Sequence, residues 1–325
     1  MKAAIVGEQG VEIADVEIPQ PKPNEVLVKV RACGLNRADL MVASGQAHGR
    51  AGGAGTVVGL EWSGEVVEVG AEAQGLQPGD RVMCSGSSGW AEYAVTDWAR
   101  AAKIPANNMT FEQAATLPVA LQTMHDAIVT NGRLARGETV LIQGASSGVG
   151  LMGLQICRAM GADLVIGTST TESRRARLAE FGADLALDSS DPGWVDAVLE
   201  ATGGEGVDLI VDQISGGVAN QNLAAAAICG RIVNVGRLGG KTGEFDFDLH
   251  ALRRIEYTGV TFRTRSVEEV REITRRMHAD LDGAVEAGEI ALPIDSTFAF
   301  EDVAAAVERM RANNHFGKIV LTLGD

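Results

Sequence analysis

The chain has 325 residues and a formal net charge of −15, because 43 acidic side chains outnumber 28 basic ones. A surface this acidic repels phosphate backbones and argues against nucleic-acid binding as the main function. Apolar residues make up 46% and charged residues 22% of the chain, a globular composition that excludes a disordered protein.

The first hundred residues favour a β-rich, barrel-like unit. Short apolar runs such as 26–30 (VLVKV) and 64–69 (GEVVEV) are separated by Pro and Gly turns such as 77–80 (QPGD). Many short strands with turn signals between them are typical of barrels.

No stretch of the sequence stays apolar over the ~18 residues that span a bilayer, and the N-terminus lacks a signal-peptide core. The four cysteines lie far apart, with neither disulfide nor zinc-ribbon spacing. We therefore expect a cytoplasmic protein with free thiols and no membrane segment.

The pattern becomes helical at about Phe111, and Pro118 is expected to break or kink the segment 111–129. Four apolar strands then alternate with helices, which is typical of a parallel sheet with right-handed crossovers. The predicted strands are 140–145, 164–167, 207–214 and 231–236, and the predicted helices are 150–160, 173–181 and 218–228. After about residue 262 we expect a helix at 267–286 and a strand at 317–323.

The strongest motif, VLIQGASSGVGLMGLQICRAMGA, covers residues 140–162. Its strand ends at Gly144, and Gly148 and Gly150 open the following helix. Glycines at these positions let backbone N–H groups approach a pyrophosphate at the helix N-terminus. The strand, turn and helix context favours a dinucleotide site over the alternative, a purely structural turn.

The end of the next strand predicts the cofactor. Ser169 stands where an NAD enzyme would place an Asp or Glu on the ribose hydroxyls. Thr170, Thr171, Arg174 and Arg175 follow, and a guanidinium binds phosphate through two hydrogen bonds. We therefore expect NADPH, with Arg174 or Arg175 on its 2′-phosphate; the alternative is that both arginines are solvated surface charges.

Several segments, taken in order, resemble the medium-chain dehydrogenase/reductase superfamily, and within it the zinc-free quinone oxidoreductase (NADPH:quinone reductase-like) branch. These segments are 26–45, 57–70, 77–82, 111–128, the ASSGVG turn, 233–240 and 317–321. The resemblance implies an α/β fold with a GroES-like, β-rich catalytic domain formed by residues 1–120 and 262–325. It implies an inserted Rossmann NADPH-binding domain at residues 121–261, and an active-site cleft between the two domains.

Zinc enzymes of this superfamily hold their catalytic metal at positions that correspond to Asn36, Leu60 and Val119. A carboxamide and two aliphatic side chains do not hold zinc, so we expect no metal. Asp39 and Glu61, which support the metal site in the zinc enzymes, are present here. We expect them to hydrogen-bond turns under the cleft.

The resemblance also implies roles for single residues. Thr123 is expected beside the nicotinamide, and Asn36 is expected to donate a hydrogen bond to a substrate carbonyl; alternatively, Asn36 is a structural loop amide. Met41, Ala47 and Leu60 are expected to line the substrate cleft. The further expected cofactor contacts are Arg37, Ser147, Gly148, Val149, Val235, Gly236, Phe262 and Lys318.

Together these expectations predict an NADPH-dependent, zinc-independent reductase that transfers hydride to a small quinone or another α,β-unsaturated carbonyl. Neither Tyr93 nor Tyr257 has the Lys four residues later that short-chain dehydrogenases use, so simple alcohol oxidation is not expected. Two alternatives stay open: an enoyl-thioester reductase of a polyketide or fatty-acid type pathway, and an NADPH-binding regulatory protein with little turnover. We also expect a homodimer, paired through the segment 257–263, which falls at the sheet edge in relatives.

Overall fold

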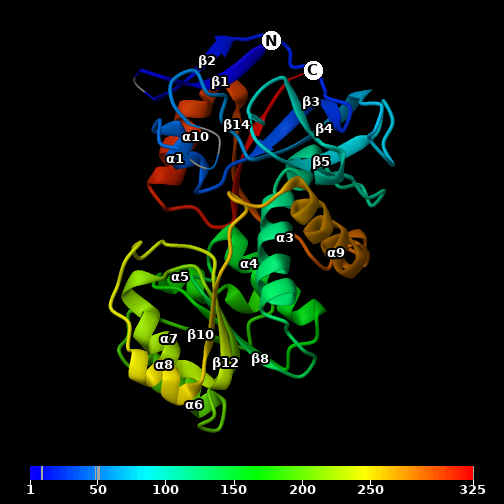
Figure 1. Cartoon of the computed structure of the whole chain (residues 1–325). Helices are drawn as coiled ribbons and strands as arrows, with labels where there is room; N and C mark the ends of the chain where they lie inside the picture. The colour runs from blue at the N-terminus through cyan, green and yellow to red at the C-terminus, as the bar shows by residue number, and fades with distance from the viewer. Residues whose placement is uncertain (9, 48, 50–51, 325) are drawn as a thin grey trace. The chain divides into compact units, whose positions relative to one another are not determined.

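Two units make up the chain in the computed structural model, which describes residues 1–8, 10–47, 49 and 52–324. Unit 1 combines Met1–Val119 with Phe262–Asp325, and unit 2 is Ala120–Thr261 (Figure 1). The chain therefore leaves unit 1, forms the whole of unit 2 and returns, so unit 1 is built from both ends of the sequence.

Unit 2 contains a six-stranded sheet in which all strands are parallel. In spatial order they are β10 (Leu185–Leu187), β9 (Leu164–Thr168), β8 (Thr139–Gln143), β11 (Val207–Asp212), β12 (Ala226–Asn234) and β13 (Glu256–Gly259). The direction in which the chain adds strands reverses between β8 and β11, and such sheets bind ligands at this switch point, outside the carboxyl ends of the strands. The predicted parallel α/β sheet is confirmed.

The helices of unit 2 differ from the prediction at two places. After α3 (Pro118–His125), which leads into the unit, they are α4 (Gly148–Ala159), α5 (Glu172–Arg175), α6 (Trp194–Ala201), α7 (Ala219–Ala225) and α8 (Phe247–Arg253). The predicted helix 218–228 ends early because Ala226 already pairs with Val207 as the first residue of β12, so sheet pairing overrides the helix propensity of an alanine run. The predicted helix 173–181 is only α5 followed by a 3-10 turn, which ends where Gly182 adopts a left-handed φ of 101°.

Unit 1 contains a seven-stranded, largely antiparallel sheet. In spatial order the strands are β14 (Ile294–Ala299), β15 (Lys318–Thr322), β3 (Glu25–Gly34), β4 (Glu61–Val69), β5 (Arg81–Ser85) and β7 (Ala101–Lys103), while β6 (Tyr93–Asp97) also pairs with β3. A separate hairpin joins β1 (Lys2–Gly7) to β2 (Gly10–Asp15). The predicted β-rich unit is confirmed.

Short helices lie between the strands of unit 1, and one long helix follows the return of the chain. They are α1 (Asp39–Ala43), α2 (Phe111–Ala114), α9 (Val267–Glu286) and α10 (Val303–Arg311). The prediction of a helix over 267–286 is confirmed by α9. Pro118 begins α3 (Pro118–His125) after α2 has ended, which confirms the predicted break, because proline is tolerated at the first position of a helix.

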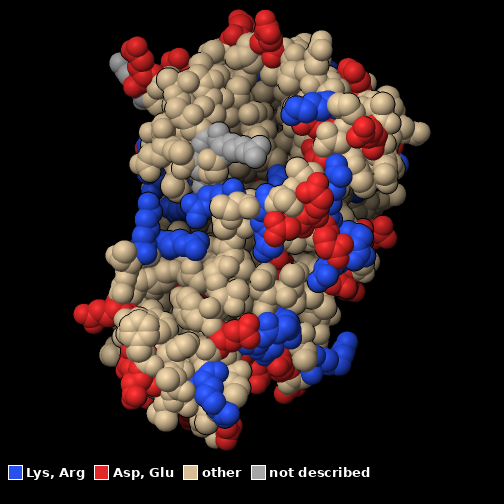
Figure 2. All heavy atoms as spheres, in the orientation of Figure 1, with Lys and Arg blue, Asp and Glu red and all other residues tan. Residues whose placement is uncertain are grey.

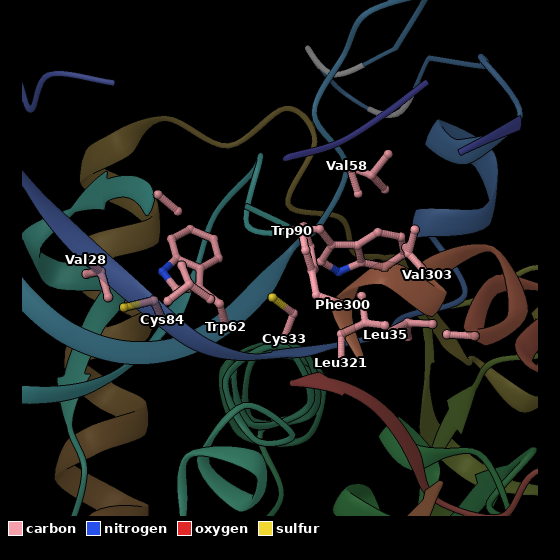
Figure 3. Packing of buried hydrophobic residues seen from close by; sticks show 14 of the residues in the cluster. Val28, Cys33, Leu35, Val58, Trp62, Cys84, Trp90, Phe300, Val303 and Leu321 are labelled. Carbon is pink, nitrogen blue, oxygen red and sulfur yellow. The ribbon is translucent and has the colours of Figure 1, made fainter. Parts of the chain in front are cut away.

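The core of unit 1 draws on both ends of the chain (Figure 3). Trp62 and Trp90, both fully buried, belong to one cluster with Phe300, Val303 and Leu321 from the returning segment. Because β15 pairs antiparallel with β3, the C-terminal strand lies within the sheet. Unit 1 therefore has a complete core only when the chain has returned from unit 2.

Charges of both signs are present on the face seen in Figure 2. In the part of the chain that the structure describes, no helix combines the length and the apolar composition needed to cross a membrane.

Candidate functional site

The turn between β8 and α4 forms a backbone cradle at the carboxyl edge of the parallel sheet. Gly144 ends the strand with a left-handed φ of 70°, and the Ser147 hydroxyl caps α4 by accepting from the N–H of Gly150 at 3.0 Å. A Cβ on Gly150 would lie 2.6 Å from the carbonyl oxygen of Gly144, so this turn requires glycine. The N–H groups of Gly148 and Val149 open the helix without intrahelical acceptors. This arrangement fits the pyrophosphate of a dinucleotide.

Buried amides hold this turn in place. Thr168 Oγ1 accepts from the N–H of Gly144 at 3.0 Å and donates to Gln143 Oε1 at 2.7 Å. Gln213 Nε2 donates to the carbonyl oxygens of Gln143 and Gly144 at 3.1 and 3.3 Å, and Gln213 Oε1 accepts from Ser147 Oγ at 3.0 Å. Sequence reasoning missed both glutamines. In the sequence, each is a polar residue at the end of an otherwise apolar strand, and this pattern could have identified it.

The end of β9 presents the residues from which the cofactor was predicted. Ser169 is buried, and its hydroxyl donates to Ser146 Oγ at 2.9 Å. Thr170 and Thr171 are exposed, and Arg174 is half-buried on α5.

The neighbouring Arg175 has a structural role here. Its Nη1 donates to the carbonyl oxygen of Ser169 at 2.8 Å and pairs with Asp188 at 2.9 Å. These contacts tie Arg175 to the end of β9.

The loop after β12 is fastened to the end of β11. The N–H groups of Val235 and Gly236 both donate to the carbonyl oxygen of Asp212, at 2.8 and 3.1 Å. A Cβ on Gly236 would lie 2.5 Å from the carbonyl oxygen of Gln213. Gln213 therefore contacts the turn between β8 and α4 through its side chain and the 235–236 loop through its backbone.

Thr123, which was expected beside the nicotinamide, lies half-buried on α3.

In unit 1, three side chains meet in a buried polar cluster. Lys318 Nζ donates to Asn36 Oδ1 at 3.0 Å and forms a short ion pair with Glu61 Oε1. Asn36 Nδ2 donates to the same Glu61 oxygen at 2.9 Å. Glu61 Oε2 accepts from the N–H of Val119 at 2.9 Å, and Asp39 Oδ2 accepts from the N–H of Asn36 at 2.7 Å. Asp39 thus hydrogen-bonds the loop before α1, and Glu61 hydrogen-bonds the backbone at the start of α3.

The structure brings the predicted Asn36 and Lys318 together, but the partners of Lys318 are Asn36 and Glu61. Its predicted contact with the pyrophosphate stays a prediction. Arg37 is exposed, and its Nη2 donates to Asn313 Oδ1 at 2.5 Å. The remaining predicted residues are the half-buried Met41, Leu60 and Phe262 and the exposed Ala47.

The donor set of the cluster does not suit a metal ion. The ammonium of Lys318 already occupies oxygen atoms of Asn36 and Glu61 that a cation would need, and two like charges would repel each other there. Within the described ranges of the chain, no three His, Cys, Asp or Glu side chains group in a way that would hold a metal.

Asp39 lies under this cluster without access to solvent. Burial raises the pKa of its carboxyl group to about 8, and the negative charge of Glu61 adds to the increase. The N–H of Asn36 and the ammonium of Lys318 oppose it. The folded protein therefore keeps Asp39 protonated at pH values where an unfolded chain, with a carboxyl pKa of about 3.9, has lost the proton.

This difference predicts a pH dependence of stability. Between about pH 4 and about pH 8 the folded state binds one proton more than the unfolded state, so Asp39 lowers stability as the pH rises. Asp39→Asn cannot ionise and keeps an oxygen for the N–H of Asn36. We expect the free energy of unfolding of the variant, measured by urea denaturation, to increase relative to the unmodified protein from about pH 5 to about pH 8. Parallel pH profiles for the two proteins would contradict this assignment.

Comparison with known proteins relates both units to one family. The model of the alcohol dehydrogenase GroES-like domain matches residues 22–106, and the model of the zinc-binding dehydrogenase matches residues 148–279. Human quinone oxidoreductase is 30% identical over 313 residues, which cover 95% of this chain and 92% of that protein.

Two further proteins resemble the whole chain. A highly reducing polyketide synthase of Alternaria alternata is 31% identical over 322 residues, and the match covers 97% of this chain but only 12% of the synthase. A solved alcohol dehydrogenase superfamily protein from Novosphingobium aromaticivorans superposes with a TM-score of 0.89 at 28% identity, over 100% of both chains.

Proteins of this family are oxidoreductases that bind a nicotinamide cofactor, and the parallel sheet with its glycine turn fits such a cofactor. The chain belongs to the medium-chain dehydrogenase/reductase superfamily, in its quinone oxidoreductase-like branch.

Proposed function

We propose that the chain is an NADPH-dependent, zinc-independent reductase of small quinones and other α,β-unsaturated carbonyls. The observation that carries the proposal is the Asn36 amide, which stands at the position of a metal ligand in the zinc enzymes and is held by Glu61 and Lys318. When bound, the nicotinamide cofactor supplies the hydride. The likeness to human quinone oxidoreductase supports this substrate class.

In the proposed reaction, Asn36 donates a hydrogen bond to the carbonyl oxygen of the substrate. Negative charge collects on this oxygen as hydride reaches the conjugated carbon, and a preoriented donor stabilises that charge. Water then protonates the resulting enolate or hydroquinone monoanion. Met41, Ala47 and Leu60 would line the substrate side with small or flexible apolar groups, which suits compact acceptors.

We propose that no zinc takes part. The match to the zinc-binding dehydrogenase model covers residues 148–279 and includes none of Asn36, Leu60 and Val119. The ammonium of Lys318 supplies a fixed positive charge beside Asn36 instead.

For the cofactor, we propose NADPH over NADH. Buried Ser169 offers no carboxylate to the ribose hydroxyls, and the exposed Thr170 and Thr171 with Arg174 suit a phosphate. The backbone of 147–149 would hold the pyrophosphate, with Arg37 as a further contact. The carboxamide group of the nicotinamide would lie against Val235, Gly236 and Phe262, with Thr123 beside the nicotinamide ring.

A second candidate function is the reduction of an enoyl thioester. The support for it is the 31% identity with a segment of a highly reducing polyketide synthase, which includes nearly the whole of this chain. The chemistry at Asn36 would be the same, because a thioester carbonyl also gains negative charge when hydride adds to its conjugated carbon.

We propose that the protein forms a homodimer through β13, which is an edge strand. The N–H of Val260 donates to the carbonyl oxygen of Asn234 in β12. By strand alternation, the backbone groups of Tyr257 and Gly259 then face away from β12 and are available to a second copy of the chain. Phe247 on α8 is 76% exposed, and its ring contacts Phe245, which in turn contacts Tyr257 of β13, so exposed apolar surface lies beside this edge strand.

We also propose a cytoplasmic location. All four cysteines are free thiols, and Cys229 is exposed. Exposed thiols persist in reducing compartments.

The substrate class is tested by steady-state kinetics. We expect NADPH-dependent reduction of 2-cyclohexen-1-one and 1,4-benzoquinone, and very slow oxidation of ethanol. Asn36→Ala should lower kcat by about 10²–10³ and change KM much less. Asn107→Ala removes a loop amide that bonds the backbone of Val285 and Glu286 instead, and serves as the matched control. Faster oxidation of ethanol than reduction of either acceptor would refute the proposal.

Cofactor preference is tested by fluorescence titration. A charge-assisted contact to phosphate contributes about 1.5–3 kcal/mol, so Arg174→Ala should weaken NADPH binding about 10–100-fold and leave NADH binding unchanged. Arg177→Ala is the control, because Arg177 pairs with Glu180 on the same segment. Equal affinity of the unmodified protein for NADH and NADPH would exclude this preference.

The dimer is tested by light scattering at micromolar concentration. Gly259→Pro removes an outward N–H of β13 and should shift the protein toward the monomer. Gly259→Ala is the control, since a Cβ at this position meets no neighbouring atom within 4 Å. A dimer that survives Gly259→Pro would rule out this interface.

A further inference from the structure

The Asn36 cluster is assembled at the ends of three neighbouring strands of unit 1. Asn36 lies just beyond β3, Glu61 begins β4 and Lys318 begins β15. In the sheet, Gly34 is opposite Glu61, and the N–H of Leu35 donates to the carbonyl oxygen of Ile319. The register of the sheet therefore fixes where the three side chains start.

A glycine makes room for the carboxylate. A Cβ on Gly34 would lie 2.6 Å from Glu61 Oε1 and 2.3 Å from the carbonyl oxygen of Ala115. Only glycine leaves this space for the carboxylate of Glu61. The cluster is a built feature of the sheet.

The ion pair also selects one orientation of the Asn36 amide. Asn36 Oδ1 accepts from the ammonium of Lys318, and Asn36 Nδ2 donates to the carboxylate of Glu61. If the amide were flipped, its NH₂ group would face the ammonium and its oxygen would face the carboxylate. Both contacts would then be repulsive, so the flipped orientation is excluded.

In this orientation, one of the two N–H donors of the Asn36 amide is left for a further hydrogen bond. The NH₂ group of Asn36 carries two hydrogens, and within the described chain it makes one hydrogen bond, to Glu61. The ammonium on Oδ1 draws electron density toward the oxygen and strengthens both N–H donors. Asn36 is 7% exposed and Lys318 is 3% exposed, so little water screens this effect.

We propose that Lys318 and Glu61 are positioning residues, which hold Asn36 so that its remaining polarised N–H meets the substrate oxygen. The inference rests on the proposed function, in which Asn36 contacts the substrate. It gives Lys318 a role in turnover, whereas the family resemblance implied a contact with the cofactor.

A double-mutant cycle separates these two roles. Lys318→Met, Asn36→Ala and the double variant are compared with the unmodified protein in the NADPH-dependent reduction of 2-cyclohexen-1-one. We expect Lys318→Met to lower kcat about 10–100-fold alone and less than about 3-fold in the Asn36→Ala background, because both changes remove one interaction. The Kd for NADPH should stay within about 3-fold. An equal loss in both backgrounds, or weaker NADPH binding with unchanged kcat, would overturn the inference.

Two further variants keep the test decisive if Lys318→Met fails to fold. Lys318→Arg retains the charge and should recover part of kcat. Glu61→Gln has the same size, but its oxygen is needed by the N–H of Val119, so its NH₂ group would face the NH₂ group of Asn36 and the ammonium of Lys318 and break both contacts. Glu61→Gln should therefore lose kcat as Lys318→Met does. Full activity of Glu61→Gln would contradict the positioning role.

Arg271→Met is the matched control. Arg271 pairs with Asp97 at 2.7 Å in the same unit, so its loss removes an ion pair without touching Asn36. We expect a lower melting temperature and a kcat within about 2-fold of the unmodified protein.

A spectroscopic measurement separates failure of this inference from failure of the proposed function. In protein labelled with ¹⁵N-asparagine, the side-chain resonances of Asn36 are assigned by their loss in Asn36→Asp. They should shift in Lys318→Met and in Glu61→Gln, and stay in place in Arg271→Met, whether or not any acceptor is reduced. Unmoved resonances refute the positioning role. Moved resonances with a kinetically silent Asn36→Ala refute the proposed function instead.

Discussion

The antiparallel pairing of β15 with β3 is the interaction on which unit 1 depends. It joins the last strand of the chain to one of the first, with Leu321 opposite Cys33 and Thr322 opposite Ala32. The same pairing brings Lys318 to Glu61, which is 257 residues away in the sequence. The core and the candidate catalytic cluster are therefore completed by one event, the return of the chain from unit 2.

Burying the charged groups of this cluster costs free energy, and packing alone does not explain why they are buried. Glu61, Lys318 and Asp39 are all buried, and replacing a buried ion pair with apolar residues of similar volume often leaves a protein equally or more stable. Removing a single partner of such a pair costs about 3–5 kcal/mol, since the other charge is left without compensation. A sheet end that holds a carboxylate, an ammonium and an amide in contact is better explained by a requirement for oriented polar groups than by a requirement for stability.

Features encoded within a short stretch of sequence could be predicted. The glycine turn, the helix over 267–286 and the break at Pro118 follow from local spacing, capping and backbone restriction, and the parallel sheet follows from the alternation of apolar strands and helices. The alanine run at 224–227 misled the prediction because its secondary structure depends on pairing with Val207, which lies outside the run. The partners of Lys318 were beyond reach for the same reason, since strand register over long separations decides them. Gln213 was missed because a polar residue after an apolar strand has many possible partners until the neighbouring strands are placed.

Each unit contains a buried side-chain amide whose orientation is fixed by hydrogen bonds at both of its ends. In unit 2, the Gln213 amide accepts from Ser147 and donates to the carbonyl oxygens of Gln143 and Gly144, which fixes the phosphate turn. In unit 1, the Asn36 amide accepts from Lys318 and donates to Glu61. An amide carries a donor and an acceptor on one rigid plane, so neighbours of opposite kind on its two ends leave it a single orientation. Because both amides are buried, losing that orientation would leave unpaired polar atoms away from water, and this penalty keeps each loop in one conformation. In the proposed reaction this rigidity matters, since a donor that is already in place does not have to reorganise when charge develops on the substrate oxygen.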